Sequence, residues 1–146
     1  MVAKVDMPPG VENKIPDGLK PDGSPYKVLV VDDSMFIAKQ LSQIFTSEGF
    51  EVVGTAADGA QGFERYKEMF PNVDLVTMDI TMPVMDGVTS LEKIIEFDKN
   101  ACVIMVSALG KEDVVKKSLL TGAKSYIVKP LDRKKVLERV VSVLNR

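Results

Sequence analysis

From Tyr26 onward, short apolar runs alternate regularly with segments whose apolar residues recur every three or four positions. The runs have the length of strands and occupy residues 26–31, 51–56, 73–78, 101–106 and 124–128. The segments between and after them have helical periods, as in Ile37, Leu41 and Ile44. Strict alternation of strands and helices predicts a parallel sheet covered by helices on both faces.

The composition of these runs narrows the topology of the sheet. The middle runs are almost continuous in Val, Ile, Leu and Met, as expected of strands buried on both faces. Right-handed crossovers leave few arrangements for five such strands. The chain has 146 residues, enough for one domain with one core and too few for two. We therefore predict an α/β fold of the (βα)5, flavodoxin-like type, with a five-stranded parallel sheet in the order 2-1-3-4-5.

Residues 1–25 have neither a strand period nor a helical period. They contain five of the eight prolines, and the tripeptide Pro-Asp-Gly at 16–18 and again at 21–23 predicts two turns. We expect a flexible or surface-hugging N-terminal tail over residues 1–25 and one folded domain over residues 26–146.

Missing and rare residue types exclude several kinds of chemistry. The chain has no histidine, which excludes histidine catalysis and histidine-ligated metal, and its one cysteine, Cys102, cannot form an internal disulfide. No apolar stretch approaches the roughly 18 residues that span a bilayer, and the N-terminus lacks the apolar core of a signal peptide. We expect a cytoplasmic protein that does not bind membranes.

Basic side chains are concentrated in residues 111–146, whereas the rest of the chain is acidic. Such a region could meet an acidic partner or simply form two solvated helix faces. Because no helix has a dense Lys/Arg stripe with interleaved aromatic residues, we do not expect nucleic-acid binding.

Polar residues follow four of the five apolar runs. Asp32 and Asp33 come after the first run, Asp79 after the third, Ser107 after the fourth and Lys129 after the fifth. Because the carboxyl ends of parallel strands meet at one edge of a sheet, these side chains should converge there, at the usual ligand site of such folds. The sequence predicts a pocket with three carboxylates, one hydroxyl and one ammonium.

Taken singly, these residues have simpler explanations. Asp32 or Asp33 could cap the first helix, Ser107 could begin a loop, and Lys129 could lie on the surface. Their joint placement at strand ends argues against coincidence. Three neighbouring carboxylates repel one another and persist where a hard cation joins them. Mg²⁺ prefers carboxylate oxygens, and the lack of histidine or thiol ligands argues against zinc.

Four separated motifs, each at a strand end, resemble the receiver domains of two-component response regulators. They are Val-Val-Asp-Asp-Ser at 30–34, Met-Asp-Ile-Thr-Met-Pro-Val-Met-Asp-Gly at 78–87, Val-Ser-Ala at 106–108 and Val-Lys-Pro at 128–130. The resemblance covers residues 26–146 and is closest to single-domain chemotaxis regulators of the CheY type.

The resemblance implies roles for the acidic residues. Asp79 would be the phospho-acceptor, taking a phosphoryl group from a CheA-like histidine kinase. Asp33, Asp79 and the backbone carbonyl of Thr81 would bind Mg²⁺ directly, and Asp32 would hold metal-bound water. A free Asp is ionised at neutral pH and can act as the nucleophile.

The resemblance also implies a switch. Lys129 and Ser107 would contact the phosphoryl oxygens, Tyr126 would turn inward, and the peptide bond before Pro130 would be cis. The partner face would comprise the fourth helix, fifth strand and fifth helix, with contacts at Lys116, Lys117, Tyr126, Lys134 and Lys135.

Two outputs are compatible with this resemblance. The first is phosphorylation-dependent binding to a FliM-like flagellar motor switch protein in chemotaxis, and the second is transfer of the phosphoryl group to a histidine phosphotransfer protein in a phosphorelay. Because the chain ends directly after the fifth helix, we expect output by protein binding. We also expect the protein to be a monomer. We do not expect an enzyme, beyond catalysis of its own phosphoryl transfer and dephosphorylation.

Two other protein classes fit the sequence less well. A haloacid-dehalogenase-type phosphatase would carry Asp-x-Asp after the first strand, where this chain has adjacent Asp32 and Asp33. A flavodoxin-type electron carrier would need a Ser/Thr/Gly-rich phosphate loop there, which residues 35–38 do not supply. Within the receiver family, Thr81 and Leu109 stand where side chains control water access, so the phosphoryl lifetime stays open.

Overall fold

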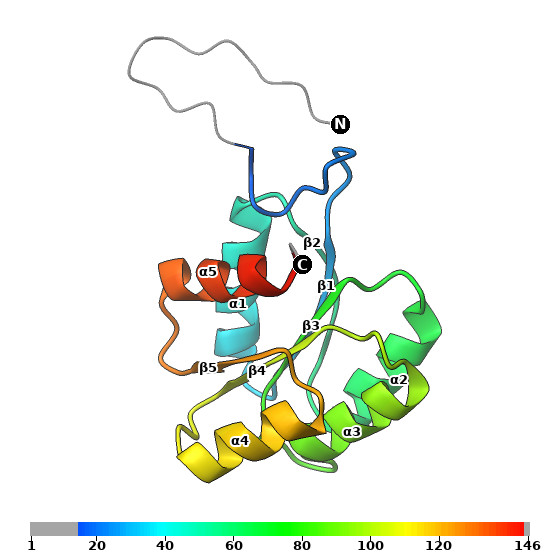
Figure 1. The fold of residues 1–146 in the computed structure, drawn as a ribbon, viewed down its shortest axis with the longest axis vertical. Helices are drawn as coiled ribbons and strands as arrows, with labels where there is room; N and C mark the ends of the chain where they lie inside the picture. The colour runs from blue at the N-terminus through cyan, green and yellow to red at the C-terminus, as the bar shows by residue number, and fades with distance from the viewer. Residues whose placement is uncertain (1–14, 145–146) are drawn as a thin grey trace, which may run out of the picture.

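The computed structural model describes residues 15–144, in which strands and helices alternate throughout (Figure 1). The strands are β1 Lys27–Val31, β2 Glu51–Ala56, β3 Leu75–Met78, β4 Val103–Ser107 and β5 Ser125–Val128. The helices are α1 Met35–Ser47, α2 Gly59–Met69, α3 Gly87–Phe97, α4 Glu112–Thr121 and α5 Arg133–Leu144. Within these residues, no helix has both the length and the apolar character needed to cross a bilayer.

The strands form one parallel sheet in the order β2-β1-β3-β4-β5, which confirms the predicted topology. Four of the strands begin one or two residues later than predicted, although some of the preceding residues also bond to neighbouring strands, as the N–H of Asp74 does to the carbonyl of Lys27. The carboxylate of Asp74 accepts the backbone N–H of Lys27 (2.8 Å), and the N–H of Ala101 bonds to the carbonyl of Asp98 (3.1 Å).

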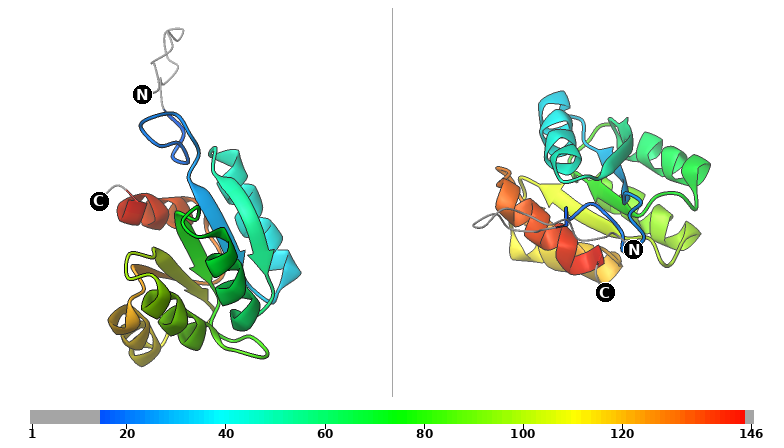
Figure 2. Two further views of the ribbon diagram at one scale, coloured as in Figure 1. Left: turned by 90° about the vertical axis from the view of Figure 1, so that its right-hand side faces the viewer. Right: turned by 90° about the horizontal axis from the view of Figure 1, so that it is seen from above.

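Different helices cover the two faces of the sheet (Figures 1 and 2). Leu41 of α1 and Val136 of α5 share one buried cluster, and Tyr66 of α2 and Leu91 of α3 share the other, against which α4 also packs. Successive residues of β1 point to opposite clusters, so this central strand is buried on both sides. Each fully buried aliphatic side chain contributes about 1.5–3 kcal/mol to folding.

Side-chain caps set the starts of three helices. The side chains of Ser34, Asp58 and Asp86 accept backbone N–H groups at the starts of α1, α2 and α3, at 3.3, 2.8 and 2.8 Å. Such caps are worth about 1 kcal/mol each. Because Ser34 is the cap of α1, the simpler explanation that Asp32 or Asp33 caps this helix is wrong.

Residues 15–25 pack against the end of α1 and the start of β2 (blue in Figure 1). The N–H of Gly18 bonds to the carbonyl of Glu48, and the N–H of Tyr26 bonds to the carbonyl of Gly18, both at 2.8 Å. A Cβ at Gly18 would lie 2.2 Å from the backbone nitrogen of Phe50, so only glycine fits. The rest of the predicted tail, residues 1–14, lies outside the described residues, and the domain boundary at 25/26 stays a prediction.

Candidate functional site

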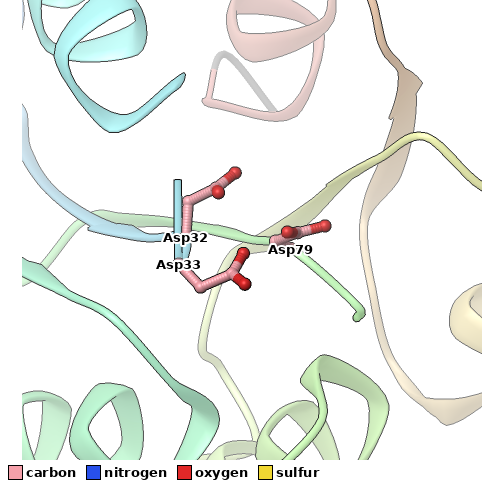
Figure 3. A group of neighbouring side chains, drawn as sticks. All are labelled: Asp32, Asp33 and Asp79. Atoms are coloured by element: carbon pink, nitrogen blue, oxygen red, sulfur yellow. The ribbon is translucent and has the colours of Figure 1, made fainter. Parts of the chain in front are cut away.

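Three carboxylates meet at the carboxyl ends of two neighbouring strands. Asp32 and Asp33 directly follow β1, Asp79 directly follows β3, and these strands pair in parallel up to Val31 and Met78. Each carboxylate offers one oxygen, and these oxygens lie within 4.8 Å of one another (Figure 3). The structure therefore brings together the three aspartates that the sequence singled out.

Backbone contacts place Asp79 in this group. Its N–H bonds to the carbonyl of Val31 (2.9 Å), and its own Oδ1 accepts the N–H of Ile80 (2.8 Å). The loop then returns so closely that a Cβ at Gly87 would lie 1.8 Å from the carbonyl oxygen of Asp79. Gly87 is therefore a site-forming residue, and its signal in the sequence is the Met-Asp-Gly at 85–87.

The three carboxylates differ in their access to water. Asp32 and Asp79 are only 4% and 6% exposed, whereas Asp33 is exposed. Burial raises the pKa of Asp79, the negative charge of Asp32 raises it further, and the ammonium of Lys129 acts in the opposite direction. A buried carboxylate beside two others is costly alone, so the site favours a cation at its centre.

Lys129 reaches the carboxylates from the edge strand of the sheet, since it directly follows β5. Its ammonium donates to Oδ2 of Asp32 at 2.9 Å and lies 3.4 Å from Oδ2 of Asp79. Its backbone N–H bonds to the carbonyl of Ser107, and the Lys129–Pro130 peptide bond is cis, as the resemblance implies. The Phe70–Pro71 bond is also cis, which the sequence did not indicate.

Ser107 and Tyr126 both hold the loop between β4 and α4. The hydroxyl of Ser107, buried at the end of β4, accepts the N–H of Leu109 at 3.1 Å. The hydroxyl of Tyr126 donates to the carbonyl of Leu109, and burial raises the pKa of this phenol. Tyr126 is 6% exposed, so its ring points inward here. The loop beside the carboxylates is thereby tied to β5.

Two hollows are lined by residues that the sequence singled out. One, of about 440 Å³ between α3 and α4, is lined by Thr81 and Leu109 among others. The other, of about 580 Å³ along β5 and α5, is lined by Tyr126, Lys135 and Arg139 among others. The remaining lysines of the predicted partner face, Lys116, Lys117 and Lys134, are exposed on α4 and α5. The role of the Thr81 carbonyl as a metal ligand stays a prediction.

Three exposed apolar side chains near the carboxylates were not singled out from the sequence. Met35 and Phe36, which open α1, are 87% and 76% exposed, and Val84, in the loop after β3, is 85% exposed. Val84 also has a φ of 68°, the only positive φ of a non-glycine residue within 15–144. Apolar residues at a helix start normally predict packing, so their exposure had no signal in the sequence.

The donor set fits a magnesium ion. Three carboxylates supply hard oxygen ligands within one small volume, and two of them, those of Asp32 and Asp79, are buried. Mg²⁺ binds through one or two carboxylates together with water and phosphate oxygens. The grouping of Asp32, Asp33 and Asp79 is the only such acidic cluster found among residues 15–144.

Comparisons with known proteins identify the family and similar chains. A model of the response regulator receiver domain matches residues 28–141. The chemotaxis protein CheY of Treponema pallidum (strain Nichols) is 67% identical over 144 residues, which are 99% of this chain and 99% of that protein. The chemotaxis protein CheY of Bacillus subtilis (strain 168) is 47% identical over 120 residues, 82% of this chain and 98% of that protein.

A solved structure is also similar along most of the chain. It is the CheX–CheY–BeF3–Mg²⁺ complex from Borrelia burgdorferi, with a TM-score of 0.88 and 62% sequence identity. The match covers 89% of this chain and 98% of that one.

Proposed function

The chain belongs to the response regulator receiver domain family and is of the CheY type, and from this we propose that Asp79 accepts a phosphoryl group from a histidine kinase when Mg²⁺ is bound. The observation that carries this proposal is the meeting of buried Asp79 with Asp32, Asp33 and the ammonium of Lys129. A nucleophile, a cation site and a positive side chain are the parts that phosphoryl transfer requires.

In the proposed step, an oxygen of Asp79 forms a bond to phosphorus while the bond from phosphorus to the donor's imidazole nitrogen breaks. The electron pair of the broken bond stays on the nitrogen, which takes up a proton from solvent. Asp33, Asp79 and the carbonyl of Thr81 would hold the metal, which neutralises charge between the carboxylates and the phosphoryl oxygens.

The phosphoryl group would then redirect Lys129 and Ser107. The ammonium now shared between Asp32 and Asp79 would pair with a phosphoryl oxygen, because that dianion carries more charge than a carboxylate. The hydroxyl of Ser107 would exchange its bond from the Leu109 N–H for a phosphoryl oxygen. Since the Leu109 carbonyl accepts from Tyr126, this change would reach the face formed by α4, β5 and α5.

The relatives favour chemotaxis as the setting. Two are named chemotaxis protein CheY, and the Borrelia CheY structure contains CheX. We propose a CheA-like kinase as donor and a FliM-like motor switch protein as output partner, ahead of the phosphorelay with a histidine phosphotransfer protein. The hollow beside Tyr126 and Lys135 suits an acidic peptide. The protein would act as a cytoplasmic monomer, without nucleic acid, and would catalyse only its own phosphorylation and dephosphorylation.

The proposal is tested by incubating the protein with Mg²⁺ and acetyl phosphate and measuring its intact mass. We expect a gain of one phosphoryl group in the wild type and none in Asp79→Asn or after chelation of the metal. Asp58→Asn is the matched control, because Asp58 is a buried aspartate that caps α2. A gain that persists in Asp79→Asn would reassign the acceptor.

A further inference from the structure

Thr77 carries a buried hydroxyl that no protein group satisfies. Its side chain is 1% exposed, and its Oγ1 is the one buried side-chain nitrogen or oxygen within residues 15–144 that lacks a hydrogen-bond partner. A buried hydroxyl without a partner destabilises a fold, and valine has nearly the same shape without that cost. A threonine in the middle of this sheet therefore needs a partner that is not a protein atom.

The sheet places Thr77 directly beneath Asp79. Thr77 pairs with Val30 of β1 and Ile104 of β4, which both belong to the buried cluster under α1 and α5. The ladder continues to Asp79, whose N–H bonds to the carbonyl of Val31. Because side chains alternate between the faces of a strand, Thr77 and Asp79 point to the same face, and their Cα atoms are about 6.6 Å apart along the strand.

Lys129 extends over this same face from β5. Ile127, two residues earlier, lies in the same buried cluster, and the N–H of Lys129 continues the ladder by bonding to the carbonyl of Ser107. The ammonium lies 2.9 Å from Asp32 and 3.4 Å from Asp79, and the lysine side chain is only 15% exposed. An ammonium has three N–H donors, and these contacts use at most two of them. At least one donor has no acceptor among the side chains and carbonyls of residues 15–144.

One water molecule would satisfy both groups. Two hydrogen bonds of about 2.8 Å let a water join polar atoms that lie up to about 5.5 Å apart, which suits groups one side-chain row apart on one face. Buried waters bind where polar groups are otherwise unsatisfied, and they need two to four polar partners. Here the water would accept from the Thr77 hydroxyl and the Lys129 ammonium and donate to the carboxylate of Asp79.

We infer that Thr77 holds a buried water that anchors the ammonium of Lys129, which makes Thr77 a positioning residue for phosphoryl transfer. The water site follows from the unpaired hydroxyl, whereas its role in the transfer rests on the proposed function of Asp79. An ammonium that is held on three sides before the donor arrives needs no rearrangement as charge develops on the phosphoryl oxygens. Thr77 thus acts through Lys129 and does not touch the phosphoryl group.

A crystal structure of the unphosphorylated protein that resolves ordered water tests the site itself. We expect a water within hydrogen-bond distance of both Thr77 Oγ1 and Lys129 Nζ in the wild type, and none there in Thr77→Val. Density that shows no water between these two atoms in the wild type would overturn the inference. This result does not depend on phosphorylation, so it is separate from the test of the proposed function.

The rate of labelling by acetyl phosphate tests the role of this water. Thr77→Val should be labelled about three to ten times more slowly than the wild type, which is the effect of losing one hydrogen bond. Thr77→Ser keeps the hydroxyl and should retain most of the rate. Thr55→Val, which changes an exposed threonine on β2, is the matched control and should equal the wild type.

A double-variant cycle separates positioning from a structural effect. In a Lys129→Ala background, Thr77→Val should cause no further loss of rate, because the group that Thr77 positions is absent. An equal loss in both backgrounds would show that Thr77 acts on the fold or on Asp79 directly, and this would overturn the inference.

Stability and labelling together separate the two proposals. If the hydroxyl is simply unpaired, Thr77→Val will unfold at a higher urea concentration than the wild type and be labelled at the wild-type rate, and the inference fails. If acetyl phosphate does not label the wild type at all, the proposed function fails, and the crystal structure still decides whether the water is bound.

Discussion

Three residues at or near Asp79, the proposed acceptor, have locally unfavourable features. Thr77, two positions before Asp79, has the one buried side-chain oxygen or nitrogen in residues 15–144 that lacks a hydrogen-bond partner. Asp79 is a buried carboxylate with a raised pKa, and Val84 has a positive φ. Such local costs concentrate at functional sites, where the surrounding structure holds them in place. Thr77 lies on β3, Asp79 directly follows it, and Val84 lies in the loop between β3 and α3.

The raised pKa of Asp79 predicts a pH-dependent gain in stability from Asp79→Asn. A carboxyl whose pKa is higher in the folded state favours folding fully below its unfolded pKa, and this contribution is lost as the pH rises through the folded pKa. At neutral pH without metal, the wild type therefore carries a penalty that asparagine removes. Urea unfolding in a chelator should show Asp79→Asn as the more stable protein at pH 7.

The difference should shrink as the pH falls through the raised pKa toward 3.8, the ordinary value for aspartate. Mg²⁺ should also shrink it, because metal binding stabilises the wild type by mass action. Equal stability of the two proteins at pH 7 in chelator would contradict the electrostatic account of the site.

At the scale of elements, the segment before β1 packs at the amino ends of the strands and not beside Asp79. Residues 15–25 bond to the end of α1 and the start of β2, at the amino ends of the strands, whereas the carboxylates lie at the carboxyl ends. Lys20 adds an ion pair to Asp74 at 3.3 Å. The segment should therefore support stability without touching the chemistry.

Gly18→Ala tests this assignment. The new methyl group would lie 2.2 Å from the backbone nitrogen of Phe50 and 2.6 Å from the carbonyl oxygen of Glu48, so the segment must move away. Loss of its two backbone bonds should lower the free energy of unfolding by about 1–3 kcal/mol, with phosphorylation of Asp79 unchanged. Gly54→Ala is the matched control, since its methyl group would meet Leu29 at an ordinary 3.5 Å. If Gly18→Ala unfolds at the same urea concentration as the wild type, the segment is not part of the folded unit.

The elements also show which features of the structure sequence patterns predict and which they do not. The order of strands and the meeting of the three aspartates at one edge followed from periodicity, because alternation and right-handed crossovers leave few topologies. The contacts of residues 15–25 did not, because a close backbone approach such as that of Gly18 has no period. For the same reason the preference of Lys129 for Asp32 at 2.9 Å over Asp79 at 3.4 Å was not predictable. Sequence patterns predict on which face or at which edge of the sheet a residue lies. They do not predict which side chain it contacts, because that depends on distances of a few tenths of an ångström.

At the scale of the whole molecule, Lys129 links Asp79, the proposed acceptor, to the proposed partner face of α4, β5 and α5. It follows β5 in sequence, contacts the carboxylates that follow β1 and β3 at the same end of the sheet, and bonds through its backbone to the end of β4. Tyr126, three residues earlier, is bonded to the loop between β4 and α4. A change in the position of the ammonium can therefore be transmitted to the surface of α4, β5 and α5.

Lys129→Ala should keep the fold and separate phosphorylation from output. In this variant acetyl phosphate should still label Asp79, while the affinity for a motor switch peptide should no longer rise on phosphorylation. Titration of the peptide into phosphorylated and unphosphorylated protein measures this, with the exposed Lys124→Ala as control. If phosphorylated Lys129→Ala binds the peptide as tightly as the phosphorylated wild type, Lys129 has no part in the switch.

The most direct measurement is the position of the acyl phosphate. After labelling with acetyl phosphate and Mg²⁺, borohydride reduces a phosphorylated aspartate to homoserine, and peptide mass mapping then finds that residue. We predict homoserine at position 79 and at neither of the neighbouring carboxylates, Asp32 and Asp33, which share its site. Homoserine at 32 or 33, or a labelled protein with aspartate intact at 79, would contradict the assignment on which the function rests.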